Sequence, residues 1–443
     1  MAVDSDHAAA PRFWPRAISN SIWLSADRLV RGAFNLAVLI GIGRFLGPEL
    51  YGLYSYALAF VAIFAAFGSL SHDGILIREL VRGNRLPEAT LGSAFLLRAG
   101  GGWIGMAGAI LAAALLPNAR AEIGLVAIIA VGLLFQPFDV VDHWFQSRLQ
   151  SRYVVFVRIG AALLAGSCKI ALAWHRAALP ALAGISVAEA LLVAAGLLAM
   201  YRGQGFRASR WRIDRTEIWA LLRESAPMAA TTLLVLLFMK LDQIMLAGLV
   251  GFRELGIYAA AVRLVDLWNF IPLAVMPSLY PAVVALRNRD EAQYGRFLRR
   301  LLAAFYLLSL AVVLVNLVAG KALLGLLFGA EYMAAAPALA ILSISTVFHY
   351  SSHIRAQWLL IEHRVIYHLW SAGIGVAAVA ALNAALIPRF GFVGAATATA
   401  IGYGISAYGT SFAFRALRPI ARLQTRTFLF QWRGIVKGNG RTP

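Results

Sequence analysis

The sequence predicts an all-α polytopic membrane protein with two lobes, and three observations lead to that fold class. Hydrophobic residues fill 60% of the 443 positions, charged residues only 14%, and the mean hydropathy is +0.73. A soluble core of this size uses far less apolar material. Apolar runs of about 20 residues, enough to cross a bilayer as a helix, recur along the whole chain. A short glycine and tyrosine pattern occurs twice, which indicates an internal duplication.

The apolar runs predict about twelve transmembrane helices, with boundaries set by polar residues, glycine and proline. The predicted spans are 20–46, 52–75, 91–116, 122–145, 154–174, 178–200, 227–250, 256–285, 301–328, 334–360, 365–387 and 391–415. Glycine-rich stretches in the third span permit close helix packing. The sequence therefore divides into six spans before a basic middle segment and six after it.

The duplication is visible in the turn after the first span of each half. An offset of about 204 positions brings the two turns into register and also aligns Asn84-Arg85 with Asn288-Arg289. The matching turn residues are Gly47, Gly52 and Tyr54 in the first half and Gly251, Gly256 and Tyr258 in the second. Because six spans are an even number, both halves enter the membrane from the same side. They are predicted to be parallel repeats related by a pseudo-twofold axis along the membrane normal, with a substrate site between them.

The charge distribution predicts topology. The net charge is +19, from 40 Lys and Arg against 21 Asp and Glu. About 27 of the 40 basic residues, Arg158 among them, fall on the predicted cytoplasmic side of the spans and about five on the other, as the positive-inside rule expects. Both termini are therefore predicted to be cytoplasmic, and no nucleic-acid partner is expected.

The predicted domain organisation follows from these spans. Residues 1–16 form a cytoplasmic or interfacial tail, 17–201 the N-lobe, 202–217 a basic cytoplasmic linker, 218–416 the C-lobe and 417–443 a basic cytoplasmic tail. The N-terminal tail lacks the apolar core and cleavage site of a signal peptide, so the first span is expected to serve as the targeting segment.

The first span carries three charges among apolar residues. Asp27 and Arg31 are four positions apart and can pair on one helix face, and Arg28 shares a face with Arg31. The arginines lie roughly 14 to 18 Å from the cytoplasmic end, which is deep for a side chain that must reach the headgroups. They either pair within the helix bundle or attract an anion into a water-filled cavity, and the second interpretation is favoured.

Other polar residues of the N-lobe have less specific interpretations. Asp139, Asp142 and His143 share a face near the cytoplasmic end and predict a polar cap or gate, since a metal site needs further ligands. Lys169 and Glu189 lie at compatible depths in neighbouring helices. They form an internal ion pair, or Glu189 is a proton- or cation-coupling site. The single cysteine, Cys168, excludes an intrachain disulfide.

The C-lobe begins with a charged stretch of its own. Asp242 lies roughly 22 Å from the cytoplasmic end of its span, and Arg263 about 10 Å from the outer end of the next, so their depths nearly coincide. Lys240 and Asp266 are likewise close in depth. The four charges either form two crossed salt bridges or present a charged surface toward a lumen.

Two further features of the C-lobe bear on motion and on metals. Prolines at positions 272, 277 and 281 predict a bendable eighth span, as a gating motion requires. His349 and His353 are four positions apart, but two histidines alone are a weak metal signal. No metal and no cofactor are predicted.

Several stretches give the chain a family resemblance. They are Arg44 to Tyr54, Pro137 to Gln150, Lys240 to Leu246, Pro272 to Pro281, Leu327 to Tyr332 and Asn383 to Ala396. In these stretches the chain resembles the polysaccharide flippases of the multidrug/oligosaccharidyl-lipid/polysaccharide exporter superfamily. The resemblance implies a transporter, not an enzyme, that moves undecaprenyl-diphosphate-linked oligosaccharide to the outer leaflet of the bacterial inner membrane by alternating access. The glycan would belong to O-antigen (lipopolysaccharide), capsule or exopolysaccharide.

The resemblance also implies partners and site residues. The partners are the lipid-linked oligosaccharide, membrane lipids, and the polymerase and chain-length or export proteins of the same pathway. A diphosphate needs a cationic lumen, because guanidinium and ammonium groups bind phosphate oxygens. The expected head-group contacts are Arg28, Arg31 and Lys240, and the expected gate or charge network is Asp27, Asp242, Arg263 and Asp266. The two carboxylates of the C-lobe offset its positive charge, so the N-lobe is the better candidate for the diphosphate and Asp242 for a switchable gate.

Two alternative functions remain open at this point. A drug or cation exporter of the same superfamily would have an acidic or aromatic lumen instead of a cationic one. A membrane-embedded polysaccharide polymerase or ligase would carry a large polar outer loop with catalytic residues, whereas the predicted outer loops are short. The sequence also lacks a Walker-type loop for ATP use.

Overall fold

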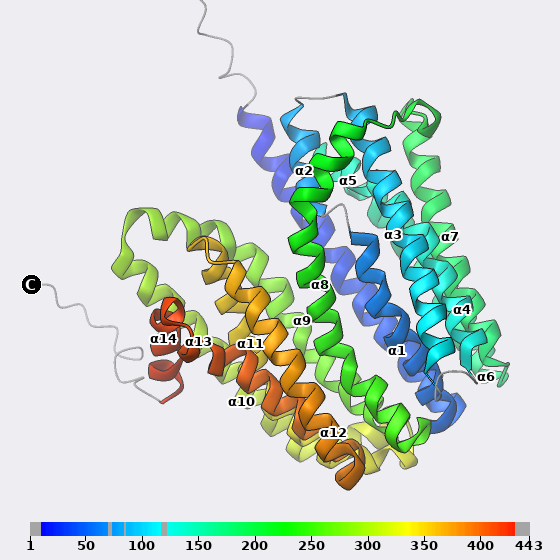
Figure 1. Cartoon of the computed structure of the whole chain (residues 1–443), viewed down its shortest axis with the longest axis vertical. Helices are drawn as coiled ribbons and strands as arrows, with labels where there is room; N and C mark the ends of the chain where they lie inside the picture. The colour runs from blue at the N-terminus through cyan, green and yellow to red at the C-terminus, as the bar shows by residue number, and fades with distance from the viewer. Residues whose placement is uncertain (1–9, 70–72, 84–85, 117–121, 430–443) are drawn as a thin grey trace, which may run out of the picture. The chain divides into compact units, whose positions relative to one another are not determined.

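The computed structural model describes residues 10–69, 73–83, 86–116 and 122–429, and every regular element within those ranges is a helix (Figure 1). The α-helices are α1 (Ala10–Phe64), α2 (Asp73–Arg82), α3 (Pro87–Leu115), α4 (Ile123–Val131), α5 (Val140–Ser147), α6 (Arg152–Trp174), α7 (Leu179–Gly203), α8 (Arg215–Val250), α9 (Phe252–Arg289), α10 (Glu291–Leu327), α11 (Ala336–Ile361), α12 (Ile366–Tyr403), α13 (Thr410–Ala413) and α14 (Arg418–Phe428). Short 3₁₀ segments continue several of them, and a π-helical turn, Gly404–Gly409, follows α12.

The predicted spans fall on these helices. Nine stretches of the described residues are long and apolar enough to cross a membrane. Two of the nine, Ser19–Arg82 and Ile366–Ala413, each contain two predicted spans joined at a glycine, and α9 contains one more. The prediction of an all-α polytopic fold is therefore confirmed.

The duplicated turns share an unusual backbone conformation. Gly47 has φ 78° and ψ 172°, and Gly251 has φ 102° and ψ 173°. This region of φ and ψ is open to glycine and strained for other residues, because a Cβ atom would clash with the backbone. Similar conformations at two positions about 204 residues apart support the interpretation of the chain as a repeat.

Contacts divide the chain into two compact units. Unit 1 comprises Met1–Leu46 and Ala57–Leu236, and unit 2 comprises Gly47–Tyr56 and Leu237–Pro443. The boundary between the units thus lies within α1 and α8, whereas the basic segment 202–217, where composition predicts a boundary, lies inside unit 1.

Unit 1 is held together by close backbone approaches as well as by apolar side chains. Gly101, Gly102 and Gly105 on α3 are buried. A Cβ atom at Gly102 would stand 2.7 Å from the Leu133 carbonyl oxygen, and one at Gly105 would stand 2.6 Å from that of Phe64. These separations leave room only for hydrogen, so the small residues of α3 permit close packing as predicted.

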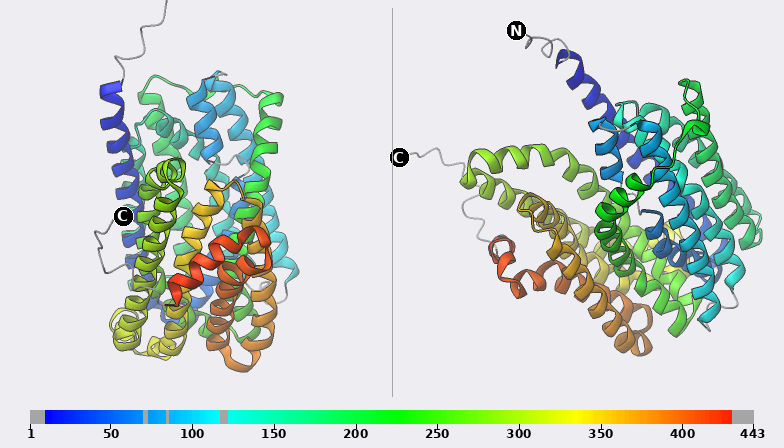
Figure 2. Two further views of the ribbon diagram at one scale, coloured as in Figure 1. Left: turned by 90° about the vertical axis from the view of Figure 1, so that its left-hand side faces the viewer. Right: turned by 45° about the horizontal axis from the view of Figure 1, so that its top comes forward.

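Unit 2 contains α9 to α12 and the second half of α8. The helices α10, α11 and α12 pack in sequence order, and α14 lies across α10 and α11 (Figures 1 and 2). Asp290 caps α10, since its carboxylate accepts hydrogen bonds from the amides of Gln293 at 3.0 Å and Ala292 at 2.8 Å. The Gln293 amide is the main reason that the pKa of Asp290 lies below its usual value.

The two duplicated turns meet inside unit 2. A Cβ atom at Gly52 would overlap the carbonyl oxygen of Phe252, and one at Gly256 would overlap that of Pro48. Because neither glycine has a side chain, the backbones of the two turns can pack directly against each other. This reciprocal contact explains why residues 47–56, although they come from the first half of the sequence, belong to the compact unit of the second half.

Candidate functional site

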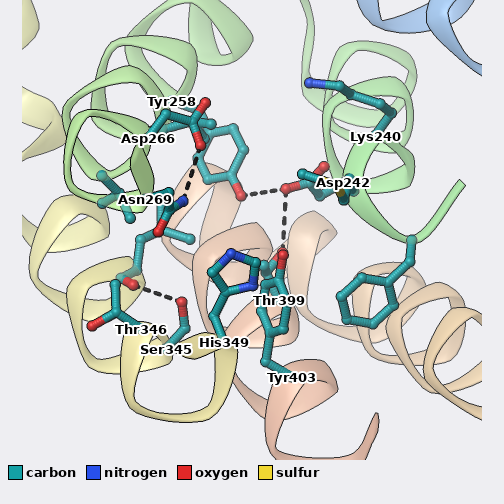
Figure 3. Close-up of a pocket in the computed structure, with 15 residues that line it drawn as sticks. Lys240, Asp242, Tyr258, Asp266, Asn269, Ser345, Thr346, His349, Thr399 and Tyr403 are labelled. Carbon is teal, nitrogen blue, oxygen red and sulfur yellow. Dashed lines mark hydrogen bonds between the residues drawn. The ribbon is translucent and has the colours of Figure 1, made fainter. Parts of the chain in front are cut away.

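A polar pocket of about 60 Å³ opens among α8, α9, α11 and α12 of unit 2 (Figure 3). Its polar lining comprises Lys240, Asp242, Tyr258, Asp266, Asn269, Ser345, Thr346, His349, Thr399 and Tyr403. The turn at Gly251 reverses the chain between α8 and α9, which brings Tyr258 opposite Asp242. The pocket therefore contains three of the site residues that the sequence singled out, Lys240, Asp242 and Asp266.

Asp242 lies at the centre of this pocket and is 4% exposed. One carboxylate oxygen, Oδ2, accepts hydrogen bonds from the Tyr258 hydroxyl at 2.5 Å and the Thr399 hydroxyl at 3.2 Å. The other, Oδ1, accepts from the backbone amide of Gln243 at 2.8 Å. Buried charge requires such partners, and here these three donors, two hydroxyls and an amide, are electrically neutral.

The crossed salt bridges suggested by depth are not what the structure contains. Asp242 bonds with Tyr258 and Thr399 and not with Arg263. Arg263 pairs with Asp266 on its own helix, with 3.5 Å between Nη1 and Oδ2. Asp242 and Arg263 lie at similar predicted depths, but their side chains leave different faces of α8 and α9. They therefore contact different partners.

Lys240 is half-buried, and Figure 3 shows its side chain extending from α8 clear of the Asp242 carboxylate. Its ammonium borders the pocket beside a carboxylate that already has its hydrogen-bond donors. Of the two alternatives predicted from the sequence, crossed salt bridges or a charged surface, the charged surface better describes the position of Lys240.

His349 of α11 lines the pocket, and His353 lies beside His349 on the same helix. The His349 and His353 rings lie 4.9 Å apart at 75°, and the His349 ring lies 4.9 Å from that of Tyr403. Within the described parts of the chain, no group of three His, Cys, Asp or Glu side chains could hold a metal ion. The sequence offered no signal that His349, Thr399 and Tyr403 would join Asp242, because they come from spans far along the chain.

Unit 1 carries a second group of buried charges, beginning with the first span. Arg31 binds Asp27 with both arms of its guanidinium, from Nε to Oδ1 at 2.7 Å and from Nη2 to Oδ2 at 2.7 Å. Asp27 is 4% exposed, and the neighbouring Arg28 is exposed. The predicted pair of Asp27 and Arg31 is confirmed, and it leaves Arg28 on the open side of the helix.

Arg158 on α6 binds the two carboxylates at the end of the fourth predicted span. Its Nη2 lies 3.0 Å from Asp139 Oδ1 and 2.8 Å from Asp142 Oδ2. Asp142 is 2% exposed and also accepts a hydrogen bond from Gln146 at 2.9 Å. The predicted polar cap therefore consists of two carboxylates that bind Arg158. From the sequence alone, Arg158 is only one of the basic residues on the cytoplasmic side.

Three further ion pairs complete this group. His143, which the sequence grouped with Asp139 and Asp142, contacts Asp73 instead, with 3.0 Å between Nε2 and Oδ1. Arg98 also pairs with Asp73, at 2.5 Å. Lys169 and Glu189 form the predicted internal ion pair, with 2.8 Å between Nζ and Oε2. A coupling role for Glu189 stays a prediction.

Comparisons with known proteins agree with this arrangement of helices. A family model described as polysaccharide biosynthesis protein matches residues 42–337. No curated protein matches the chain in sequence. Among solved structures, an inward-facing multidrug resistance MATE family transporter of the MOP superfamily matches with a TM-score of 0.69 and 14% identity, over 93% of this chain and 99% of that one.

Two other solved structures have the same fold. The lipid II flippase MurJ, in an inward closed conformation, matches with a TM-score of 0.67 and 11% identity, over 96% of this chain and 94% of that one. A MOP superfamily transporter from Pyrococcus furiosus matches with a TM-score of 0.65 and 12% identity, over 93% of this chain and 96% of that one. At these identities the matches establish the fold alone.

Proposed function

Since the chain belongs to the polysaccharide biosynthesis protein family and has the fold of MOP superfamily transporters, we propose that it flips a lipid-linked oligosaccharide. The proposed substrate is an undecaprenyl-diphosphate-linked oligosaccharide destined for O-antigen, capsule or exopolysaccharide. It would move from the cytoplasmic to the outer leaflet of the bacterial inner membrane by alternating access. Both termini of the flippase would be cytoplasmic, and it would act with the polymerase and chain-length or export proteins of the pathway.

Arg28 is the observation that carries this proposal. It is an exposed guanidinium on an apolar helix, beside a pair in which Asp27 already neutralises Arg31. The three charges together therefore leave one positive charge, and it lies on the exposed side. A cation inside a span is expensive unless it faces a water-filled cavity or a polar ligand. A diphosphate supplies the oxygens that a guanidinium binds in bidentate fashion.

Arg31 and Lys240 have different roles in this proposal. Both arms of Arg31 that face Asp27 are engaged, so a diphosphate gains Arg31 only by competing with the Asp27 carboxylate. Asp27 thereby acts as a gate on Arg31. Lys240 is half-buried at the rim of the pocket of unit 2, where Asp242 takes its hydrogen bonds from Tyr258 and Thr399. Its ammonium is the second phosphate contact that we propose.

A flipping assay in liposomes tests the proposal. The protein is reconstituted with fluorescently labelled undecaprenyl-diphosphate oligosaccharide, and label that reaches the outer leaflet is quenched or enzymatically trimmed. Arg28→Gln is expected to lower the flipping rate at least about tenfold, because a charge-assisted bidentate contact to phosphate is lost.

The control for this assay removes an arginine elsewhere. Arg253 is exposed and forms a 3.2 Å pair with the exposed Glu331, and such surface pairs contribute little to stability. Arg253→Gln should flip like the wild type. If the wild type moves no lipid-linked sugar under any ion gradient or membrane potential, the proposed function fails. If Arg28→Gln flips normally, the head-group site fails.

The pocket of unit 2 favours a second candidate, a drug or cation exporter. Asp242, Tyr258, His349 and Tyr403 give this pocket an acidic and aromatic lining, which suits organic cations. Efflux of a fluorescent organic cation from the same liposomes distinguishes the two, since a flippase should leave it inside. The solved structures compared above are two transporters and a flippase, and the polymerase or ligase alternative gains no support from the site.

A further inference from the structure

The C-terminal helix α14 has two faces of different chemistry. One face is buried against α10, α11 and the π-helical turn through Ile420, Ala421 and Gln424. Gln424 donates a hydrogen bond to the Ala407 carbonyl at 3.3 Å, and the hydroxyls of Thr425 and Tyr408 bond at 2.8 Å. The helix is thus fixed on unit 2 and is not a free tail (Figure 2).

The other face of α14 is a stripe of three exposed arginines, Arg418, Arg422 and Arg426. They are spaced four residues apart, so they line one side of the helix. The helix contains no acidic residue, and the apolar Phe428 and Leu429 at its end are exposed. Arginines on one face with exposed aromatic and aliphatic side chains nearby are typical of a helix at the membrane interface.

An apolar groove adjoins this stripe. Its volume is about 510 Å³, and its lining includes Tyr306, Phe348, Ile401, Gly404, Tyr408 and Phe428. This volume lies within the roughly 300 to 1,000 Å³ usual for ligand sites. The floor is the π-helical turn, where a Cβ atom on Gly404 would meet only the Phe348 ring, at 3.7 Å. Glycine at this position keeps the groove open.

The stripe and the groove form one continuous surface. Phe428 ends α14 and lines the groove, and its ring packs on that of Tyr306 at 5.7 Å. Thr425 lies one turn after Arg422 and is hydrogen-bonded to Tyr408 in the groove wall. A ligand with an anionic head and an apolar chain can therefore contact arginine and groove together.

We propose that this surface binds an anionic phospholipid of the surrounding bilayer, with its phosphate on the arginine stripe and an acyl chain in the groove. Charge complementarity selects this occupant. Residues 430–443 of the chain carry Arg433, Lys437 and Arg441 and no acidic residue, and a second copy would bring the same arginines. Both would be repelled by the stripe, whereas each arginine near a membrane surface attracts anionic lipid.

The position of α14 along the chain fits a headgroup-level site. The helix follows directly after the last predicted span, and Leu417 and Ile420 pack in one core with Tyr294, near the start of α10, and Leu359, near the end of α11. α14 therefore begins where two spans end. The proposal is independent of the transported substrate.

Lipid retention by the purified full chain tests the proposal. The detergent-solubilised protein is mixed with equal amounts of phosphatidylglycerol and phosphatidylcholine with the same acyl chains, and the retained molecules are counted by native mass spectrometry. The wild type should retain phosphatidylglycerol preferentially. The triple variant Arg418→Gln, Arg422→Gln and Arg426→Gln should lose that preference at least about fivefold. Gly404→Leu, which fills the groove, should lower retention of both lipids.

Matched variants keep the test decisive. Arg207→Gln, Arg210→Gln and Arg215→Gln remove three exposed charges from unit 1 and should leave the preference unchanged. Gly404→Ala adds only an ordinary contact with Phe348 and should leave retention near wild type. An unchanged preference in the α14 triple variant overturns the site. So does increased lipid retention after removal of residues 430–443, which would make that segment the occupant of the groove.

Discussion

The buried carboxylate of Asp242 in unit 2 is accommodated differently from three carboxylates of unit 1. In unit 1 the buried or half-buried carboxylates of Asp27, Asp142 and Glu189 each face a cation, at 2.7 Å from Arg31, 2.8 Å from Arg158 and 2.8 Å from Lys169. In unit 2 the buried carboxylate of Asp242 faces two hydroxyls and an amide. The same turn sequence thus opens two lobes with different electrostatics.

The buried Arg355 of unit 2 repeats the pattern of Asp242 with the opposite sign. It is 3% exposed and donates to the Ser406 carbonyl at 3.0 Å, the Ser371 hydroxyl at 2.5 Å and the Thr410 hydroxyl at 3.1 Å. An ion pair fixes the charge of both partners, because neutralising one leaves the other buried and unpaired. A carboxylate held by neutral dipoles can gain or lose a proton without stranding a partner, whereas the guanidinium of Arg355 keeps its charge. We therefore expect unit 1 to supply rigidity and unit 2 to supply the switch.

Removing Arg158 is the strongest way to test the ion pairs of unit 1. Arg158→Met strands the carboxylates of Asp139 and Asp142, and the free energy of unfolding should fall by about 3 to 5 kcal/mol. Thermal denaturation in detergent measures the loss. Adding Asp142→Asn to Arg158→Met should recover part of it, since one stranded charge is gone. Wild-type stability of the single variant would show that these charges are solvated and not paired.

Substitutions in the two duplicated turns should destabilise the protein to a similar extent, although the buried charges of the two units are accommodated differently. Gly52→Ala and Gly256→Ala each place a Cβ atom on the other turn's carbonyl oxygen, and overpacking of this kind costs about 1 to 3 kcal/mol. Thermal midpoints of the two variants should fall by similar amounts. Gly100→Ala is the control, because nothing lies within 4 Å of its would-be Cβ. A large difference between Gly52→Ala and Gly256→Ala would contradict the reciprocal contact.

Local features of the fold were predictable from the sequence. Hydropathy placed the spans, the i,i+4 spacing predicted the pair of Asp27 and Arg31, and the glycines of α3 predicted close packing. These features depend on neighbours along the chain or on helix length, both of which a sequence displays.

Partners between distant helices were not predictable. Depth along a helix placed Asp242 and Arg263 at one level, but depth does not fix which face of a helix meets which neighbour. Asp242 instead meets Thr399, 157 positions later. Arg158 entered the count of cytoplasmic charges, although it clamps two carboxylates from another helix. Such contacts depend on helix rotation and crossing, which packing decides.

Asp242→Asn is the smallest expected change in stability and the sharpest test of the switch. The Asn carbonyl oxygen can still accept from Tyr258 and Thr399, and only the bond from the Gln243 amide is lost. The cost should therefore be about 1 kcal/mol. Asp27→Asn, the matched change in unit 1, should cost more because it strands Arg31.

Transport by Asp242→Asn should no longer respond to a proton or cation gradient, since the side chain cannot change its charge. Gradient-driven transport at the wild-type rate would place the switch elsewhere, and destabilisation as large as that of Arg158→Met would show that Asp242 belongs with the fixed ion pairs of unit 1.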